Sequence, residues 1–303
     1  MTFRNFDQIE RYILDSGIKK TVALANAQDE PALSSVIYAQ RKGVIDAILI
    51  GELDGIRAIL SEHGEDEADY KLVECHDERE AAELACQMVK DGEADFPMKG
   101  IMLTANFMRA ILNKERGFFP EGSLLSQATV LQYDAEDRLV ILTDCAVNIA
   151  PDVDQKEKIT RNAVELAHRL GIEKPKIAFL SALEIVNPKI PSTVEAAELV
   201  RRFTENPDEG IGEVAGPLAL DSVVSEESAR HKNLYSPVCG HADIMVMPDL
   251  CAGNIFSKGL NFYAHLESAG ALNGSTVPVV MTSRADTPDS KYRCILLAIM
   301  QSL

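Results

Sequence analysis

The segment of this chain best suited to chemistry lies near the C-terminus, where an apolar run ends in polar side chains. Residues 277–281 are predicted to form a buried strand, which Ser283, Arg284 and Asp286 follow. In a parallel sheet, ligands bind at the carboxyl ends of the strands, and a guanidinium offers an anion a planar, permanently charged fork. The alternative is a surface turn in which Arg284 pairs with Asp286 or Asp289. The residues alone leave both interpretations open.

The final helix supports the first interpretation. Thr287 and Pro288 fit the N-cap and the first position of a helix that continues to residue 303. The unsatisfied N–H groups and the positive end of the helix dipole favour an anion at such a terminus. The sequence therefore indicates an anion-binding turn between a strand and this helix.

A second segment brings further cations. Lys99 and Gly100 are predicted to occupy a turn, and Thr104 and Arg109 lie on or near the helix that follows. Two cations facing one cleft would suit an anionic substrate. The pattern by itself favours the simpler interpretation, a solvated helix face.

Two more strand ends carry polar residues. The first is Thr143 and Asp144, with Asn148 shortly after, and an aspartate at such a place binds a hydroxyl, accepts a proton or, more commonly, caps a loop. The second lies after residues 243–247, where Asn254 and Lys258 are one helical turn apart on the same face. The alternative for both is an ordinary strand-to-helix connection.

Several catalytic signatures are missing. The sequence contains neither a G-x-x-x-x-G-K-[ST] phosphate loop nor a dinucleotide fingerprint, and neither G-x-S-x-G nor H-E-x-x-H occurs. The six histidines and six cysteines show no zinc spacing and no C-x-x-C pair. We therefore expect no metal site, no resident cofactor and no catalytic triad.

Composition restricts the partners. The 303 residues include 30 Lys and Arg against 47 Asp and Glu, a net charge of −17, and aromatic residues make up 6% without any Trp. Such a surface repels nucleic acid and anionic membranes, so an anionic ligand needs a local basic pocket. No stretch approaches the roughly 18 apolar residues of a membrane span. With scattered cysteines that are expected to be reduced, the sequence predicts a cytoplasmic protein.

The elements that must position these residues alternate between short apolar runs and longer amphipathic ones, as in an α/β fold with mainly parallel strands. Predicted helices include 78–90 and 156–170, the second followed by Gly171 as a C-cap. Predicted strands cover residues 21–25, 47–51, 71–75, 140–143, 177–181, 243–247 and 277–281.

Two clusters of helix-breaking and strand-breaking residues, 117–122 and 269–274, suggest where the chain crosses between domains. They predict a first α/β domain of residues 1–120 plus 271–303 and an inserted second domain of residues 121–270. A cleft between two domains is a natural ligand site.

Taken together, these segments resemble the phosphate acetyl/butyryltransferase family, and its butyryltransferase branch most closely. The segments follow the family's order from about residue 21 to residue 303. They are residues 98–102 (Met-Lys-Gly-Ile-Met) with Thr104 and Arg109, Thr143-Asp144 with Asn148 and Pro151-Asp152, residues 181–184 (Ser-Ala-Leu-Glu), Asn187-Pro188, and residues 282–286 (Thr-Ser-Arg-Ala-Asp).

The resemblance implies an acyltransferase that interconverts an acyl-CoA and phosphate with an acyl phosphate and CoA in a ternary complex, without a covalent acyl-enzyme. Coenzyme A is then a substrate or product and no cofactor is needed. The family fold has two α/β domains flanking a cleft, is related to the isocitrate/isopropylmalate dehydrogenase fold and is usually dimeric. We therefore expect a homodimer joined through the second domain.

Carried over by position, Ser283 and Arg284 match the family's Ser-Arg pair, which is implied to contact phosphate or CoA and polarise the thioester carbonyl. Arg109 matches an arginine implied to bind an anionic substrate group. The acetyltransferase branch has an aspartate shortly after the Ser-Arg pair, implied to take the CoA thiol proton. Counting the same number of residues from Ser283-Arg284 without a gap reaches Ser290, and we assign the role to the adjacent Asp289. The acetyl branch also has a basic run that residues 94–98 lack.

The remaining binding residues assigned at this stage surround the same strand ends. They are Lys99, Gly100, Thr104, Thr143, Asp144, Asn148, Asn254, Lys258 and Asp286.

Three alternatives stay open. One is the same reaction with acetyl-CoA, since the sequence does not fix the length of the acyl chain, for which we expect a preference for four carbons. Another is a metal-dependent decarboxylating dehydrogenase of the same fold, for which only Asp286 and Asp289 hint at a metal site. The third is a sensor that binds CoA or acyl phosphate without catalysis.

Overall fold

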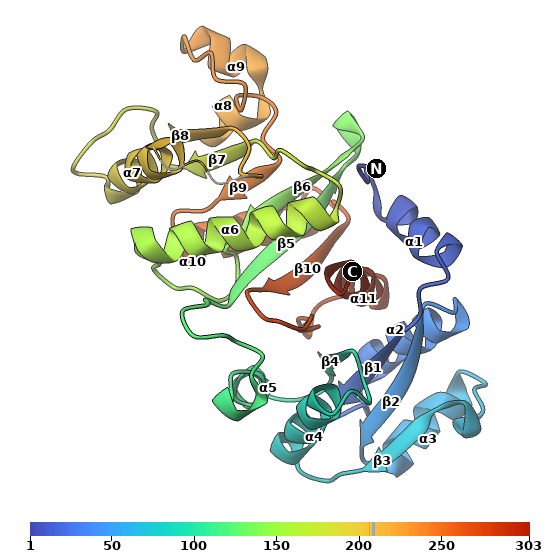
Figure 1. Cartoon of the computed structure of the whole chain (residues 1–303). Coiled ribbons are helices and arrows are strands. Elements are labelled where there is room, and N and C mark those ends of the chain that lie inside the picture. The colour runs from blue at the N-terminus through green and yellow to red at the C-terminus, as the bar shows by residue number, and fades with distance from the viewer. Residues whose placement is uncertain (206, 208–209) are drawn as a thin grey trace. The chain divides into compact units, whose positions relative to one another are not determined.

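The computed structural model describes residues 1–205, 207 and 210–303 and contains two compact units. Unit 1 comprises Met1–Asn5 and Leu124–Ser268, and unit 2 comprises Phe6–Ser123 and Ala269–Leu303. Both are built from strands that alternate with helices (Figure 1). The predicted α/β class is therefore confirmed.

Unit 2 contains a parallel sheet in the order β3-β2-β1-β4. Helix α4 packs on β1, β2 and β4, while α2 packs on β2 and against α11. The strands are β1 (Lys20–Ala25), β2 (Ile45–Gly51), β3 (Lys71–Glu74) and β4 (Phe96–Lys99). The helices are α1 (Phe6–Asp15), α2 (Glu30–Arg41), α3 (Leu53–Glu62), α4 (Glu78–Lys90), α5 (Thr104–Ile111) and α11 (Pro288–Gln301), with 3₁₀ turns η1 (Glu67–Asp69) and η2 (Lys114–Arg116).

Local sequence explains the helix bounds in unit 2. The side chain of Asp77 accepts hydrogen bonds from the backbone of Arg79 and Glu80 and thereby starts α4. The predicted apolar face of α4 is buried in the structure, including Ala82, Ala85, Cys86 and Val89. The predicted helix at residues 78–90 is therefore confirmed.

Unit 1 contains the strands β5, β6, β9, β7 and β8 in that spatial order; β5 is antiparallel to β6 and the other pairs are parallel. Strand β10 (Ser268–Asn273) starts at the edge of this sheet next to β5 and leads the chain into unit 2. The strands are β5 (Ser126–Tyr133), β6 (Arg138–Thr143), β7 (Ile177–Leu180), β8 (Val214–Leu218) and β9 (Ile244–Val246). The helices are α6 (Val153–Arg169), α7 (Pro191–Glu205), α8 (Leu220–Val224), α9 (Glu226–His231) and α10 (Leu250–Phe262), with the 3₁₀ turn η3 (Asp134–Glu136).

Helices cover both faces of the unit 1 sheet. Side chains along each strand point alternately to one face and to the other, so both faces carry residues that these helices bury. Val140 and Leu142 belong to a buried cluster to which Phe256 and Leu260 of α10 add. Helix α6 packs on β5, β6 and β9, and Figure 1 shows it crossing in front of β5 and β6. A sheet covered on both faces leaves its strand ends as the places where a ligand can enter.

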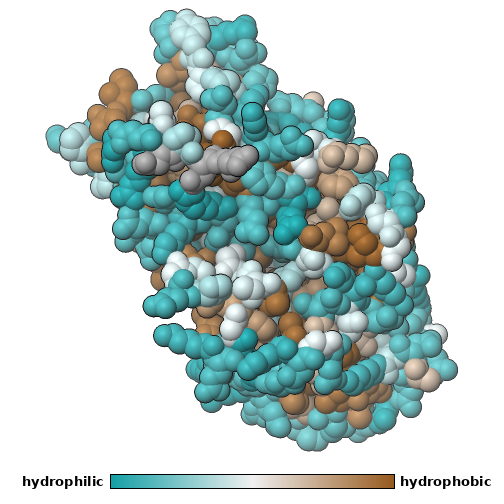
Figure 2. All heavy atoms as spheres, in the orientation of Figure 1, coloured by the Kyte–Doolittle hydropathy of each residue, from teal (hydrophilic) through white to brown (hydrophobic). Residues whose placement is uncertain are grey.

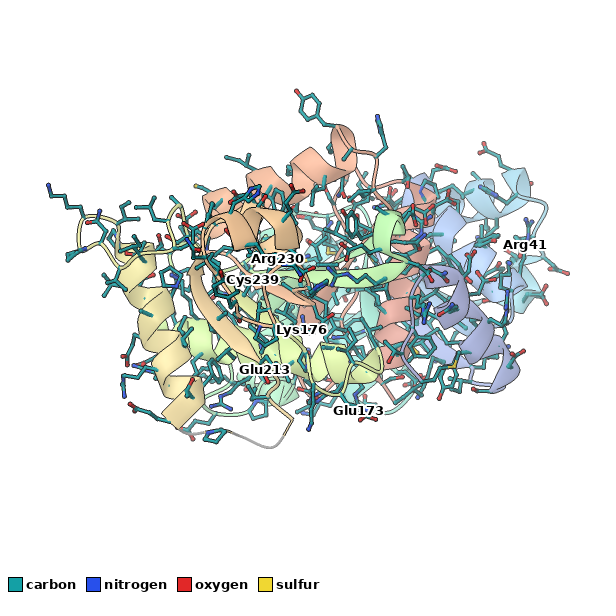
Figure 3. The ribbon with its side chains drawn as sticks, turned by 90° about the horizontal axis from the view of Figure 1, so that it is seen from above. Arg41, Glu173, Lys176, Glu213, Arg230 and Cys239 are labelled. Carbon is teal, nitrogen blue, oxygen red and sulfur yellow. The ribbon has the colours of Figure 1, made fainter. Side chains whose placement is uncertain are left out.

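Hydrogen bonds link the segments that precede β7, β8 and β9, at the amino ends of these parallel strands. The N–H of Lys176 donates to Asp243, and the N–H of Ile177 donates to the carbonyl of Glu213. Lys176 and Glu213 precede β7 and β8, and both lie in the same part of the ribbon in Figure 3. The carboxyl ends of the parallel strands lie at the opposite end of the sheet, which is where α/β sheets bind ligands.

The sequence-based strand assignments differ from the structure in three ways. Residues 277–281 form only a single parallel bridge between Met98 and Val280, partly because Pro278 has no N–H to donate. Residues 269–274, predicted as a breaker cluster, instead lie mostly in β10. Strands β4, β5, β8 and β10 were not predicted; β4 and β8 each contain a proline, which conceals a strand in a sequence pattern.

The chain as a whole has a net charge of −17. Figure 2 shows that the face turned to the viewer is mainly hydrophilic, with hydrophobic residues in separate patches. No helix in the described part of the chain is long and apolar enough to cross a membrane.

Candidate active site

The strand order of unit 2 reverses at β1, so the carboxyl ends of β1 and β4 form a topological switch point. Strand β1 leads by way of α2 to β2 on one side, whereas β4 lies on its other side. Open α/β sheets bind ligands at such a switch point. The polar residues that follow β1 and β4 are therefore the first candidates for a site.

A glycine allows the two loops at this switch point to approach each other closely. The N–H of Gly100 donates to the carbonyl of Ala25 at 2.8 Å, and the Asn26 side chain donates to the carbonyl of Ile101 at 2.5 Å. A Cβ atom on Gly100 would lie 2.2 Å from the Asn26 carbonyl oxygen. Only glycine fits here without displacing the backbone, which explains its presence in the predicted segment.

Lys99, the last residue of β4, is buried rather than solvated. The residue is 4% exposed. Among the described residues, its Nζ donates one hydrogen bond, to the carbonyl of Gly100 at 3.2 Å. Burial, together with the neighbouring charge of Lys291, lowers the pKa of Lys99 from its ordinary value. An ammonium has three donors, so two remain for a ligand.

Lys291 is a second buried lysine beside the same loops. The residue is 2% exposed, and its Nζ donates to Thr282 Oγ1 at 2.9 Å and to the Ser283 carbonyl at 2.7 Å. It is the fourth residue of α11, and it fixes the turn that precedes its own helix. The sequence analysis did not identify it, although a charged residue within a strongly apolar helical run was a usable signal.

Asp29 is a negative charge that interacts electrostatically with both lysines. It precedes α2, its side chain makes no capping hydrogen bond, and burial raises its pKa while Lys291 and Lys99 act to lower it. Arg284 also acts on both Asp29 and Lys99. We call Lys99, Lys291 and Arg284 the cationic cluster; it is an excess of positive charge inside a strongly acidic chain.

The predicted Ser-Arg turn has a defined conformation. Asp286 accepts a hydrogen bond from the N–H of Ser283 at 2.7 Å, and Ser283 Oγ accepts one from the N–H of Ala285 at 3.3 Å. Within residues 1–205, 207 and 210–303, Arg284 forms no ion pair with Asp286 or Asp289. Arg284 is exposed, so its guanidinium can reach a ligand without first breaking a salt bridge.

The start of α11 offers less to an anion than its sequence suggests. Thr287 is the N-cap, as predicted, and its Oγ1 accepts the N–H of Ser290 at 3.2 Å. Pro288 has no N–H, and Asp289 places a carboxylate in the first turn. The cationic cluster, rather than the helix terminus, therefore supplies most of the attraction for an anion.

Arg109 belongs to a different polar network. It is exposed on α5 and donates to Asn106 Oδ1 at 3.2 Å, which also accepts from Arg79 at 3.2 Å. Asn106 in turn contacts Glu78 at the start of α4. The described residues give Arg109 no hydrogen bond or ion pair with the cationic cluster, and Thr104 is the exposed first residue of the same helix.

Asp144 in unit 1 is fully occupied as a loop cap. Its two carboxylate oxygens accept the backbone N–H groups of Ala146, Val147 and Gln127, at 2.8 to 3.1 Å, and the side-chain amide of Asn148 at 2.6 Å. The residue is 3% exposed. This arrangement is the capping alternative that the sequence analysis left open.

The other candidates of unit 1 are placed around this loop. Thr143 Oγ1 donates to the Gln127 carbonyl at 3.1 Å, and Asn254 donates to the Cys145 carbonyl at 3.0 Å. Lys258 is exposed one turn further along α10. Thr143, Asp144 and Asn254 thus hold the loop, and only Lys258 presents a solvent-accessible charge.

The structure contains no cluster of three or more metal-ligating side chains within the residues that it describes. The six cysteines are unpaired, and only Cys251 is exposed. The buried lysines and the exposed Arg284 of unit 2 can bind and polarise an anion.

Comparison with known proteins places this geometry in a family. The model described as "Phosphate acetyl/butaryl transferase" matches residues 76–299. The chain is 41% identical to a phosphate butyryltransferase of Clostridium acetobutylicum, covering 98% of each chain. It is 38% identical to a phosphate acetyltransferase of Thermotoga maritima, covering 93% of this chain and 95% of that one.

Solved structures agree with this result. A branched-chain phosphotransacylase from Enterococcus faecalis V583 superimposes with a TM-score of 0.82 at 35% identity, covering 93% of this chain and 99% of the other. A 4-hydroxythreonine-4-phosphate dehydrogenase from Klebsiella pneumoniae gives a TM-score of 0.54 at 15% identity, covering 94% and 100%. The second likeness concerns the fold alone and confirms the predicted relation to a dehydrogenase-like fold.

Proposed function

Because this chain belongs to the phosphate acetyl/butaryl transferase family and is an acyltransferase, we propose that its cationic cluster binds the phosphate that exchanges with CoA on the acyl group. The reaction interconverts acyl-CoA and phosphate with acyl phosphate and CoA. The observation that carries the proposal is the pair of buried lysines, Lys99 and Lys291, whose ammonium groups retain donors at the switch point of unit 2.

The direct reaction needs no covalent acyl-enzyme. A phosphate oxygen forms a bond to the thioester carbonyl carbon, the tetrahedral oxyanion collapses, and the C–S bond breaks as CoA thiolate leaves and takes up a proton. Holding the two reactants together replaces an encounter in solution. A guanidinium at the oxyanion stabilises the transition state by roughly 3–4 kcal/mol, by analogy with single oxyanion donors.

Each residue of the site has a proposed role. Lys99 and Lys291 hold phosphate. Arg284 polarises the thioester carbonyl, and Ser283 contacts phosphate or CoA. Asp289, exposed in the first turn of α11, takes the thiol proton in the reverse direction.

The other assignments made from the sequence remain proposals. Arg109 and Thr104 on α5, and Lys258 on α10, bind anionic groups of CoA. Gly100 and Asp286 shape loops of unit 2, and Thr143, Asp144, Asn148 and Asn254 shape loops of unit 1, through the hydrogen bonds described above.

We also propose that residues 1–120 with 271–303 and residues 121–270 are the two domains, and that the second joins two copies of the chain in a homodimer. Exposed apolar side chains at the end of α10 support this: Ile255 is 72%, Phe262 61% and Tyr263 92% exposed. The unpaired cysteines fit a cytoplasmic enzyme. Light scattering of the purified chain tests the dimer, and a monomer at micromolar concentration contradicts it.

The acyl group that we propose is a four-carbon chain, with CoA as substrate and no cofactor. The 41% identity to a phosphate butyryltransferase supports it, and the acetyltransferase at 38% keeps acetyl-CoA as the alternative. The test is release of CoA thiol from acetyl-, propionyl-, butyryl- and isobutyryl-CoA, each with and without phosphate. We expect phosphate-dependent release that is fastest with four carbons, whereas equal rates without phosphate indicate a thioesterase.

Matched variants test the phosphate site itself. Lys99→Met should raise the KM for phosphate at least tenfold, while Lys114→Met, at an exposed lysine of unit 2, should leave it unchanged. Absorbance at 340 nm with NAD(P)⁺ and hydroxy acids tests the dehydrogenase alternative. Unchanged KM for phosphate in Lys99→Met would remove the lysine from the site.

A further inference from the structure

Asp29 carries a carboxylate that the fold of unit 2 leaves without a bound partner. It is the N-cap of α2, and its backbone carbonyl accepts the N–H of Leu33 at 2.8 Å, but its side chain makes no capping hydrogen bond. Pro31, in the first turn of α2, has no N–H to offer it. In the part of the chain that the structure describes, the side chain forms no ion pair either. Both carboxylate oxygens are therefore available to a ligand.

The backbone brings the loop of Asp29 to the loops of the cationic cluster. Strands β1 and β4 are parallel, and Ala25 at the end of β1 pairs with Lys99 at the end of β4. The N–H of Lys99 in turn donates to the carbonyl of Val280, shortly before the Ser-Arg turn, at 2.9 Å. The segments that lead to Asp29 and to Arg284 thus start side by side at the carboxyl end of the unit 2 sheet.

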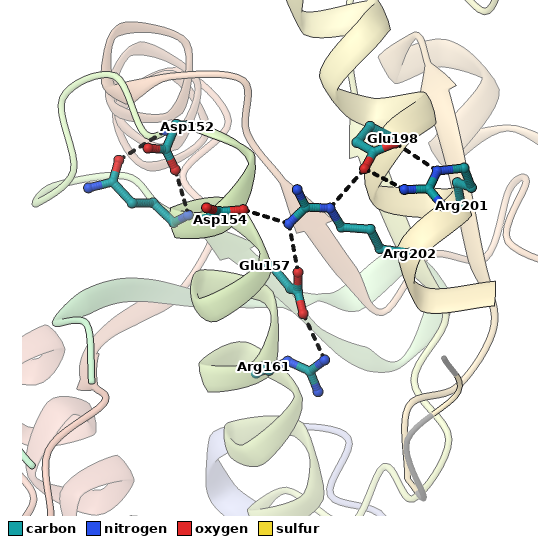
Figure 4. A network of polar contacts seen from close by, with 8 residues as sticks. Asp152, Asp154, Glu157, Arg161, Glu198, Arg201 and Arg202 are labelled. Atoms are coloured by element: carbon teal, nitrogen blue, oxygen red, sulfur yellow. Dashed lines mark hydrogen bonds and ion pairs between the residues drawn. The ribbon is translucent and has the colours of Figure 1, made fainter. Parts of the chain in front are cut away.

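Neutralisation of the lysines does not by itself explain Asp29. Where a carboxylate of this chain serves as a countercharge, it contacts its cation: Arg202 of α7 binds two carboxylates of α6, at 2.7 and 3.0 Å (Figure 4). Asp29 forms no such ion pair with Lys99 or Lys291, although it interacts with both electrostatically. The lysines donate to uncharged oxygens instead.

A ligand at the cationic cluster meets an excess of donors and one group that can only accept. An ammonium has three N–H donors and a guanidinium five. Within the described residues, Lys99 uses one donor, Lys291 uses two, and Arg284 donates no hydrogen bond. Burial raises the pKa of Asp29, and the three cations oppose this by favouring its ionised form. An ionised carboxylate accepts hydrogen bonds and donates none.

This combination matches phosphate and not every tetrahedral dianion. At neutral pH phosphate retains at least one proton, so it has a P–OH donor besides its negatively charged oxygens. Sulfate has a similar shape and charge but carries no proton. Its oxygens can accept from the cations, but the oxygen that faces a carboxylate leaves two negatively charged acceptors without a proton between them, which is unfavourable.

We propose that Asp29 accepts a hydrogen bond from the P–OH group of the bound phosphate and thereby makes the site select phosphate over sulfate. This inference rests on the proposed function, which places phosphate at the cationic cluster. A site built around a substrate hydroxyl rejects an analogue without it by roughly 10⁴-fold or more. Asp29 is only half-buried, and water weakens the repulsion, so we expect a smaller factor of about 10- to 100-fold.

The same contact distinguishes phosphate from the acyl phosphate product. When a phosphate oxygen bonds to the acyl carbon and the C–S bond breaks, the phosphate gives up its proton and the departing thiolate takes one up. The acyl phosphate is then a dianion without a P–OH group. Asp29 therefore disfavours this product as it disfavours sulfate, which assists product release. Asp29→Asn should lower the KM for butyryl phosphate relative to the KM for phosphate.

The experiment measures CoA thiol release from butyryl-CoA at varied phosphate, with sulfate as the inhibitor and chloride keeping the ionic strength constant. For the wild type, the Ki of sulfate should exceed the KM for phosphate at least about tenfold. Asp29→Asn, whose amide can donate to a sulfate oxygen, should lower this ratio about tenfold. Glu30→Gln removes the same charge from the neighbouring exposed residue and should keep the ratio of the wild type.

Calorimetry makes the same comparison without turnover. Phosphate, arsenate and sulfate are titrated separately into the wild type and into Asp29→Asn. Arsenate retains a proton as phosphate does, so the wild type should bind both, and sulfate at least about tenfold more weakly. Thermal melting identifies a variant that does not fold, in which case Asp29→Ser takes the place of Asp29→Asn.

The outcomes separate the two proposals. If the wild type releases no CoA from any acyl-CoA with phosphate, the proposed reaction fails, whereas calorimetry still tests Asp29. If Lys99→Met leaves the KM for phosphate unchanged, the phosphate site fails and this inference with it. If Lys99→Met raises that KM, but Asp29→Asn keeps the wild-type ratio or Glu30→Gln lowers it equally, only the role of Asp29 is overturned. Wild-type binding of sulfate as tight as that of phosphate also overturns it.

Discussion

Replacing Lys291 with methionine tests whether this buried lysine positions the Ser-Arg turn. The ammonium donates to Thr282 Oγ1 and to the carbonyl of Ser283, directly before Arg284. Methionine has a similar apolar length but cannot donate. The variant therefore removes the two hydrogen bonds that hold the turn while keeping α11 packed.

The size of the effect follows from those two bonds. A hydrogen bond to a charged group contributes about 1.5–3 kcal/mol, so the lower value for each gives about 3 kcal/mol for fixing the turn. If that energy is needed to hold Arg284 at the thioester, kcat falls by about 10²-fold. Stability should change by less than about 1.5 kcal/mol, because replacing the lysine also removes the penalty of burying its charge.

The assay is CoA thiol release from butyryl-CoA at varied phosphate, with urea unfolding of the same samples. We expect Lys291→Met to lose kcat with little change in the KM for butyryl-CoA, and Lys114→Met to match wild type. A variant that retains kcat and kcat/KM within threefold of wild type, or whose loss of activity simply follows unfolding, refutes the positioning role. A change confined to the KM for phosphate assigns Lys291 to phosphate binding alone.

Three further predictions concern contacts inside the two units. Gly100→Ala should destabilise the chain by about 1–3 kcal/mol in urea unfolding and reduce activity, because its Cβ collides with the Asn26 carbonyl oxygen; wild-type stability contradicts this. Glu195→Gln should lower the free energy of unfolding by about 1–3 kcal/mol in the same assay, because buried Lys156 loses the charge that compensates its own. An unchanged free energy of unfolding would mean that water replaces the partly solvated carboxylate. Hydrogen bonds from Arg201 and Arg202 lower the pKa of the Glu198 carboxyl to about 2. The stability that this carboxylate contributes is therefore present above its ordinary pKa near 4.5 and is lost as the pH falls towards 2. Unfolding of Glu198→Gln should depend less on pH over this range than unfolding of wild type.

Family membership and much of the secondary structure were predictable from the sequence. Helix α4 and the Thr287 cap depend on residues within a few positions of each other, and so a local pattern identifies them. The family segments lie in a fixed order along the chain, which needs no knowledge of contacts. Short strands with proline, such as β4, escaped because their pairing partners lie far away in the sequence.

The composition of the cationic cluster was not predictable in the same way. The sequence analysis assigned substrate contacts to both Arg109 and Arg284 without Lys291, whereas in the structure Lys99, Lys291 and Arg284 all interact electrostatically with Asp29 and Arg109 donates to Asn106.

The sequence by itself determined the periodicity of the elements, the caps and the strongly acidic balance of the chain, because these depend on neighbouring residues and on composition. Only the tertiary structure decided which charged groups interact and which carboxylate oxygens already accept hydrogen bonds from the chain. Gly100 approaches the backbone of Asn26, which lies far away in the chain, and the side chain of Lys291 donates to the Ser283 carbonyl in the turn before its own helix. The carboxylate oxygens of Asp144 accept hydrogen bonds from N–H groups of the surrounding loops. The place of Asp144 in the sequence does not show which N–H groups these are.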